Sequence, residues 1–468
     1  MTFDSLAFLI FLPAVVGIHW MLPHRWRKYW LLAVSYFFYM YWSPALIVLL
    51  LFSTVVDYCC SRGIERTEGK LRKALLLVSI VVNLGLLFSF KYLDFFGETV
   101  NSLCALLGIS YRVPALNLIL PVGISFYTFQ TMSYTIDVYR GKIQAQRDFI
   151  TFALYVTFFP QLVAGPIERA GALLPQLQAE RSPSKEDFAS GFQLLVSGFF
   201  RKVVIADLCG RFVDRVYGAS GAVDGAAVAV ATVLFAVQIY CDFAGYSEIA
   251  AGSARLMGVR LMRNFDRPYL SGSIREFWRR WHISLSGWFT DYIYIPLGGS
   301  RRGLQRQIFA TLVVFAASGL WHGARWTFVL WGLFHGALMV LELLLPKRKE
   351  QHRWLWVGLT FCAVTLSWIF FRSNTVEQAF GFLAALAQPW DLSGAWEQLG
   401  MTMPDAVQLL LVLLHLPWLH RLSKTMDAGQ PREKLSDVTY VYYLMVIICA
   451  WLLRLENNAV NTFIYFQF

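Results

Sequence analysis

Charged residues are scarce in this sequence. Asp, Glu, Lys and Arg make up only 15% of its 468 residues, whereas about a quarter of the residues in a soluble domain are charged. Long polar stretches are scarce as well, because apolar runs recur from Ser5 to the C-terminus with only short polar breaks. These shortages exclude a soluble globular enzyme, a disordered chain and a secreted disulfide scaffold.

Several common chemical motifs are also absent. The seven cysteines contain no C-x-x-C pair, which argues against a zinc site and a redox motif. The sequence has no glycine-rich phosphate loop, no H-E-x-x-H, no G-x-S-x-G and no dense carboxylate cluster. We therefore expect no metal and no bound cofactor. Without a metal or a nucleotide-binding loop, the chemistry would depend on histidines and on a phosphate-bearing ligand, for which candidates are described below. This combination suggests group transfer from an activated donor.

What the sequence has in abundance is apolar and aromatic residues. Hydrophobic residues make up 57% of the chain, which includes 17 Trp, 21 Tyr and 38 Phe. This composition predicts an all-α, polytopic membrane protein with roughly eleven membrane-crossing helices. The expected spans are Ser5–Leu22, two helices within Tyr29–Tyr58, Lys73–Tyr92, Leu116–Val138, Val223–Tyr240, Ile308–Leu320, Phe328–Leu345, Trp354–Phe371, Val407–Leu419 and Tyr440–Leu453.

The charge pattern predicts an orientation in the membrane. The net charge is +11, and we attribute it to basic cytoplasmic loops rather than to nucleic-acid binding. The basic loops His24–Lys28 and Ser61–Lys73 are expected on the cytoplasmic side, which puts the N-terminus outside. We expect no cleavable signal, because the residues before the first apolar run carry no Lys or Arg and no small-residue cleavage site follows the run. The absence of an internal repeat argues against a transporter.

Two segments depart from simple membrane helices. Two prolines within Phe149–Pro166 predict a broken or re-entrant element. Ala189–Leu208 has the pattern of an amphipathic helix at the membrane surface, with Arg201 and Lys202 on its wet side. Asp242 ends an apolar span and is expected either to pair with an arginine or to line a polar path.

The segment Arg275–Trp288 is both aromatic and polar. Read as one helix, it presents two stripes. The aromatic stripe comprises Trp278, Trp281, Leu285 and Trp288, and the polar stripe comprises Arg275, Arg279, His282 and Ser286. Guanidinium groups in a polar groove suit a phosphate-bearing ligand. The alternative is an interfacial helix whose arginines contact lipid phosphates, although His282 is not explained by that alternative.

His322 is the strongest candidate for a catalytic residue. It follows an apolar run and is flanked by Gly319 and Gly323, which permit close backbone approach. A buried neutral imidazole can accept a proton near neutral pH. The alternative is a core histidine bonded to a backbone carbonyl. His335 is a second candidate in a weaker context.

Two paired motifs make the chain resemble the membrane-bound O-acyltransferase family. They are Phe277–Ser286 and, about forty residues later, Trp321–Gly323. Supporting matches are Pro121–Tyr127, Phe159–Pro166, Asp242–Ser247 and Tyr294–Gly299. The resemblance covers about residues 1–345 and is strongest to alginate-type polysaccharide O-acetyltransferases. It implies a catalytic membrane core over residues 1–345 and a helical C-terminal extension over residues 346–468, within one membrane domain.

The resemblance also implies roles for particular residues. In this family a central tunnel is entered from the cytoplasm by an acyl thioester. His322 matches the catalytic histidine and His282 matches its partner position. Expected donor-binding residues are Trp278, Arg279, Arg280 and Ser286, and candidate tunnel-lining residues are Tyr240, Asp242, Tyr246, Gln161 and His335.

We therefore expect an enzyme of the bacterial inner membrane that moves an acyl group from a thioester. The expected acyl group is acetyl, and the expected donor is acetyl-coenzyme A. The acceptor is a hydroxyl of an extracytoplasmic polysaccharide, reached directly or through a partner transferase. Some alginate-branch members carry His where this chain has Gln161, which leaves the acceptor open. The alternatives are D-alanyl transfer of the teichoic-acid type and transport of an acyl donor or glycan.

Overall fold

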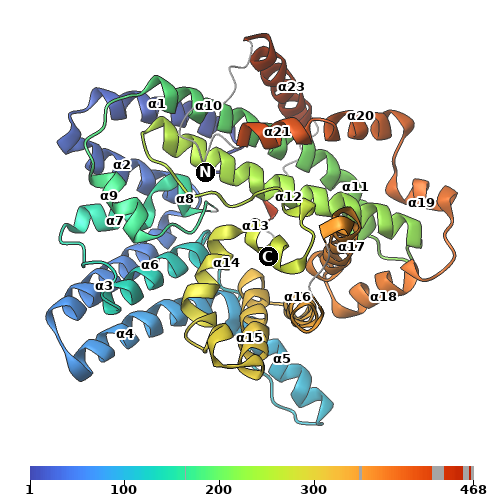
Figure 1. Ribbon diagram of the computed structural model, residues 1–468, viewed down its shortest axis with the longest axis horizontal. Coiled ribbons are helices and arrows are strands. Elements are labelled where there is room, and N and C mark those ends of the chain that lie inside the picture. The colour runs from blue at the N-terminus through green and yellow to red at the C-terminus, as the bar shows by residue number, and fades with distance from the viewer. Residues whose placement is uncertain (164, 347–349, 424–436, 457–462, 465–468) are drawn as a thin grey trace. The chain divides into compact units, whose positions relative to one another are not determined.

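The computed structural model describes residues 1–163, 165–346, 350–423, 437–456 and 463–464 (Figure 1). Every regular element within these ranges is a helix, which confirms the predicted all-α class. The chain divides into two compact units. The first comprises Met1–Ser184 and Ser253–Leu261, and the second comprises Lys185–Gly252 and Met262–Phe468. The predicted boundary at residue 345 stays a prediction.

The first unit is built from nine helices in the part of the chain described. They are α1 (Leu6–Met21), α2 (His24–Met40), α3 (Ile47–Arg66), α4 (Gly69–Leu87), α5 (Leu93–Leu106), α6 (Ile124–Tyr139), α7 (Phe149–Thr157), α8 (Phe159–Leu162) and α9 (Ala170–Gln178). Helix α3 packs against α4 and α6, and α2 packs against α7. The predicted break within Tyr29–Tyr58 is confirmed, because a 3₁₀ turn starting at Pro44 separates α2 from α3.

The prediction of a broken element within Phe149–Pro166 is also confirmed. Helix α7 ends at Thr157, and the single turn of α8 follows with Pro160 in it. A proline at that position cannot donate a backbone hydrogen bond to a continuing helix. Gly123, which precedes α6, approaches this turn closely: its φ is +76°, and a Cβ there would lie 2.5 Å from the carbonyl oxygen of Leu162.

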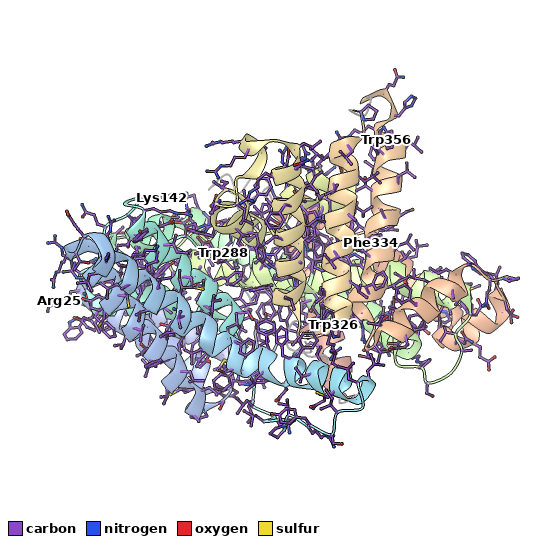
Figure 2. All side chains as sticks on the ribbon, turned by 90° about the horizontal axis from the view of Figure 1, so that it is seen from below. Arg25, Lys142, Trp288, Trp326, Phe334 and Trp356 are labelled. Atoms are coloured by element: carbon purple, nitrogen blue, oxygen red, sulfur yellow. The ribbon has the colours of Figure 1, made fainter. Side chains whose placement is uncertain are left out.

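The second unit contains the remaining helices. They are α10 (Lys185–Phe199), α11 (Asp207–Tyr217), α12 (Gly225–Leu256), α13 (Ile274–Arg280), α14 (Ile283–Phe289), α15 (Leu304–His322), α16 (Trp326–Leu344), α17 (Arg353–Arg372), α18 (Val376–Leu386), α19 (Leu392–Leu399), α20 (Met403–Leu413), α21 (Leu416–Ser423) and α23 (Asp437–Glu456). A π-helical segment, η3 (Phe200–Ala206), joins α10 to α11. Figure 2 shows α16 and α17 side by side, with Trp326 and Trp356 at opposite ends of the pair.

Among the described residues, fewer helices are long and apolar enough to cross a membrane than the eleven spans expected. Five described helical segments are long and apolar enough to cross a membrane, and a pair of helices bent by 78° could supply a sixth. The five are Pro44–Arg66, Gly69–Leu106, Gly225–Leu256, Trp326–Leu344 and Arg353–Arg372. The predicted count of eleven is therefore not confirmed. The main reason is length: α1 and α6 have only 16 residues each and α2 only 17.

The prediction of a wet face at Arg201 and Lys202 is wrong. Both side chains are buried in the second unit. Arg201 Nε lies 3.1 Å from a carboxylate oxygen of Glu248, and Lys202 Nζ lies 2.7 Å from one of Asp242. Both acids belong to α12, so the cations pair with a helix far along the chain instead of facing water. Buried charges persist when they are paired in this way.

Candidate active site

The segment Arg275–Trp288 is not one helix. Helix α13 ends at Arg280 and α14 begins at Ile283, and His282 between them has a φ of +43°. This left-handed conformation is uncommon for a residue other than glycine. The predicted polar stripe is therefore broken at His282. Its imidazole is fully buried, whereas Arg275 and Arg279 remain exposed.

The break at His282 is held by the preceding loop. The backbone N–H of Ile283 donates to the Asn264 carbonyl, and the N–H of Asp266 donates to the Arg280 carbonyl, both at 2.9 Å. The Asn264 side-chain oxygen also accepts from the Ser284 hydroxyl at 2.6 Å. Hydrogen bonds on both sides of His282 fix its position in the core. Burial lowers the pKa of His282 to about 3, so the imidazole is neutral at neutral pH.

His322 ends α15 and is also buried. Its ring is enclosed by the rings of Trp321, Trp331 and Phe371, at centroid distances of 5.0, 5.0 and 5.5 Å. The predicted close approach at Gly319 is confirmed, because a Cβ there would lie 2.3 Å from the carbonyl oxygen of Phe328 in α16. His322 thus lies about one helical turn after the point where the backbones of α15 and α16 approach closely.

The structure brings His282 and His322 together. Their ring centroids lie 6.4 Å apart, and Trp321 contacts both rings. Phe243 closes the other side of His282 at 4.7 Å. A direct hydrogen bond between the rings would need a nitrogen–nitrogen distance near 3 Å. With their centroids 6.4 Å apart, the two rings do not reach that distance.

His335 has a different environment. The Trp278 indole N–H donates to His335 Nδ1 at 3.3 Å, and His335 Nε2 lies 2.9 Å from the Ser367 hydroxyl. Because an indole nitrogen is only a donor, Nδ1 must be the acceptor, and Nε2 then carries the proton. The Ser367 hydroxyl accepts a hydrogen bond from this N–H and donates its own to the Val364 carbonyl at 2.6 Å. His335 therefore links α13, α16 and α17 through a complete set of hydrogen bonds.

A cavity of about 570 Å³ lies among α13, α14, α15 and α16. Three of the four predicted donor-binding residues line it, namely Trp278, Arg279 and Ser286. Its other polar lining residues include Arg275, Asp291, Gln307, Thr311 and Ser318. Ser318 lies one helical turn before His322 on α15. The cavity thus combines cationic side chains with a wall that leads toward the histidine pair.

The fourth predicted donor-binding residue, Arg280, is not among the residues that line this cavity. Its guanidinium pairs with Glu276 at 2.6 Å, one turn back on α13. The two neighbouring arginines therefore differ in surroundings: Arg279 lines the cavity, and Arg280 has a carboxylate partner.

Comparison with known proteins identifies the family. A sequence model of the membrane-bound O-acyltransferase family matches residues 140–349. The "Probable alginate O-acetylase AlgI" of Azotobacter vinelandii is 34% identical over the whole of both chains. The protein of the same name from Pseudomonas aeruginosa is 37% identical over 84% of this chain and 76% of its own length. The "Peptidoglycan O-acetyltransferase" of Helicobacter pylori is 34% identical over 77% and 73%.

The chain belongs to the membrane-bound O-acyltransferase family. It falls with the alginate-type O-acetyltransferases of that family and is an O-acyltransferase of the acetyltransferase kind. As a family member it is a multi-pass membrane protein. The resemblance drawn from the paired histidine motifs is thereby confirmed.

Three of the five tunnel-lining candidates of this acyltransferase lie on α12. Asp242 pairs with Lys202 at 2.7 Å and accepts the backbone N–H of Ile464 at 2.8 Å. The two alternatives expected for Asp242 were an arginine partner and a polar path, and its partner is a lysine. Tyr246 stacks on Phe463 at 4.3 Å, and the Tyr240 hydroxyl lies 2.7 Å from His420 Nε2.

Gln161 belongs to the first unit of the acyltransferase. Its side-chain amide is buried and donates to the carbonyl of Tyr155 at 2.8 Å. Gln130 donates to the same carbonyl at 2.7 Å. Gln161 therefore helps to hold the broken segment between α7 and α8.

Several residues around the histidine pair were not found from the sequence. Trp331 and Phe371 enclose His322, and Phe243 covers His282. Phe243 could have been found, because it lies within the motif Asp242–Ser247. No sequence pattern distinguishes Trp331 and Phe371 from the other apolar residues of their helices. Among the described residues, no group of three or more His, Cys, Asp or Glu side chains is arranged to hold a metal ion.

Proposed function

We propose that this O-acyltransferase moves an acetyl group from a thioester, such as acetyl-coenzyme A, to a hydroxyl of a polysaccharide. The observation that carries the proposal is the buried pair of His282 and His322, 6.4 Å apart, beside a cavity with two arginines. The relatives named for alginate and peptidoglycan O-acetylation support a polysaccharide acceptor. Relatives named for teichoic-acid D-alanylation match a smaller part of the chain, which favours acetyl as the acyl group.

In the proposed mechanism, His322 is the general base. It takes the proton of the acceptor hydroxyl while the hydroxyl oxygen attacks the thioester carbonyl carbon. The new carbon–oxygen bond forms, and the electron pair of the carbonyl moves to its oxygen. Collapse of this intermediate breaks the carbon–sulfur bond, and the thiolate takes the proton from the His322 imidazolium. The products are an acetyl ester and a free thiol.

His282 is proposed to act on the carbonyl oxygen. Its neutral imidazole can donate one N–H to the negative charge that develops there. The backbone hydrogen bonds of Ile283 and Asp266 fix the backbone on both sides of His282, and a donor positioned in advance is the condition for electrostatic stabilisation. A hydroxyl or carbonyl between the rings would then have the base on one side and the donor on the other.

The cavity with Arg275 and Arg279 is the proposed binding site for the donor. Guanidinium groups suit the phosphates of coenzyme A, and the apolar lining from Trp278 and Phe315 suits the rest of the donor. We place the cavity mouth on the cytoplasmic side of the bacterial inner membrane, with the N-terminus outside. Residues 1–345 would form the catalytic core, and residues 346–468 an extension. The acetyl group would reach the outside directly or through a partner transferase.

Acetyl-coenzyme A labelled in the acetyl group tests this function. The purified protein should release thiol and transfer label to a polysaccharide acceptor, with or without an added periplasmic transferase. Alginate, cellulose and peptidoglycan fragments are the acceptors to compare. Thiol release that does not depend on His322, or transport of the donor without turnover, would contradict the proposal.

A further inference from the structure

A second cavity, in the first unit, has a strongly cationic lining. It has a volume of about 490 Å³ and lies where α1 turns into α2. Four cationic side chains line it, Arg25, Arg27, Lys28 and Arg181, against one carboxylate, Asp148. The acyl-transfer chemistry proposed above does not use any of these residues. The cationic lining of this cavity therefore has a role separate from acyl transfer.

The four cationic side chains differ in whether a nearby carboxylate neutralises their charge. Lys28 Nζ lies 2.6 Å from Asp148, so these two charges largely cancel. Arg27 donates to the carbonyls of Leu22 and Arg181, at 3.0 and 2.6 Å. Backbone carbonyls leave its positive charge without a neutralising anion. Arg25 is exposed and has no ion pair or hydrogen bond among the described residues.

Two further features favour an anion. Helix α2 begins at His24 with no acidic residue in its first turn and no side-chain cap, and both His24 and Arg25 line the cavity. A helix N-terminus carries partial positive charge and unsatisfied backbone N–H groups. His19, which is only 5% exposed, also lines the cavity, and its Nδ1 has no hydrogen-bond partner within the described part of the chain.

The aromatic lining distinguishes a lipid from a soluble phosphate. Trp26 and Tyr29 line the cavity yet stay 53% and 45% exposed, and the neighbouring Met21 is 84% exposed. Large exposed aromatic residues beside cations are typical of the membrane–water interface. Inorganic phosphate would gain nothing from this apolar surface, whereas lipid acyl chains can pack on it.

We infer that this cavity binds the phosphate group of an anionic phospholipid. Arg25, Arg27 and the N-terminus of α2 contact the phosphate, and the acyl chains lie along the exposed apolar residues. This inference does not depend on the proposed function, because the residues are separate from the histidine pair and its cavity.

Native mass spectrometry of the full-length protein in detergent tests the inference. The probes are phosphatidylglycerol and phosphatidylcholine with identical acyl chains. We expect phosphatidylglycerol to bind at least about fivefold more tightly, since each cation near an anionic lipid contributes about that factor. Equal binding of the two lipids would overturn the inference. Displacement of phosphatidylglycerol by inorganic phosphate or coenzyme A would also overturn it, in favour of a soluble phosphate ligand.

Three variants assign the binding to this cavity. Arg25→Gln should weaken phosphatidylglycerol binding about fivefold. Asp148→Asn should strengthen it by a similar factor, because it frees Lys28 while Asn still caps α7 in place of Asp. The matched control is Arg66→Gln, which removes an exposed arginine from the other basic loop of this unit. If all three leave binding unchanged, or if Arg66→Gln weakens it as much as Arg25→Gln, the cavity is not the site.

Discussion

His335 and the pair formed by His282 and His322 are all buried in the second unit, and their surroundings differ. His335 has a protein partner for each ring nitrogen, through Trp278 and Ser367. The ring centroids of His282 and His322 lie 6.4 Å apart, and aromatic rings surround both. All three imidazoles are buried. Burial therefore does not distinguish a structural histidine from a candidate catalytic one.

We infer that His335 differs from His282 and His322 in the role of its imidazole proton. The hydrogen bonds of His335 assign its proton to Nε2 and use it to join three helices, so a proton transfer there would break the packing. In the proposed mechanism, the His322 imidazole instead takes up and releases a proton during each transfer. Substitutions at the three histidines and at the neighbouring arginines test this difference.

The largest effect is expected at His322. His322→Ala should lower the rate of acetyl transfer by about 10²–10⁴-fold, because a hydroxyl needs a base to become nucleophilic at neutral pH. His322→Gln should be nearly as slow, since an amide cannot take the proton. Both rates should be measured with labelled acetyl-coenzyme A on protein that elutes as a single species. Binding of unreacted donor is the control and should persist.

A slightly smaller loss is expected at His282. Removing one hydrogen-bond donor to a developing oxyanion typically costs about 10²–10³ in kcat, and His282→Ala should show a loss of this size. The donor's KM should change little if His282 acts mainly in the transition state. A large rise in KM with kcat unchanged would instead make His282 a binding residue.

His335 should respond in stability rather than in rate. His335→Ala leaves the Trp278 indole and the Ser367 hydroxyl without their partner, at a cost of about 1–3 kcal/mol in the free energy of unfolding. Thermal unfolding in detergent should show the loss, while turnover per folded molecule stays close to that of the unaltered protein. A stable but inactive variant would remove the distinction between His335 and the histidine pair.

The smallest effect concerns the two neighbouring arginines. Arg279→Gln should raise the KM for the acyl donor about fivefold. A solvent-accessible charge contact contributes about 1 kcal/mol to binding, which corresponds to that factor. Arg280→Gln is the matched control, because Arg280 pairs with Glu276 and is not a lining residue of the cavity. Equal effects of the two substitutions, or none, would argue against the cavity as the donor site.

Local signals predicted part of this molecule correctly. The prolines marked the break before α3 and the break between α7 and α8, because proline acts on its own backbone. The glycines beside His322 indicated the close helix contact that the structure shows at Gly319. These features depend on residues adjacent in the sequence.

Features set by distant residues were not predicted. The left-handed turn at His282 depends on Asn264 and Asp266, and helical periodicity across Arg275–Trp288 gave no sign of it. The burial of Arg201 and Lys202 depends on two carboxylates of α12, about 40 residues away. An amphipathic pattern shows that charges share a face, but not whether that face meets water or acids.

The most direct test of the central claim compares His322→Gln with His335→Gln in one assay. Each protein is given labelled acetyl-coenzyme A and an acceptor, and the label transferred per folded molecule is measured. The account predicts near-complete loss for His322→Gln and nearly full transfer for His335→Gln. Transfer by a well-folded His322→Gln protein at the rate of the unaltered enzyme would contradict it.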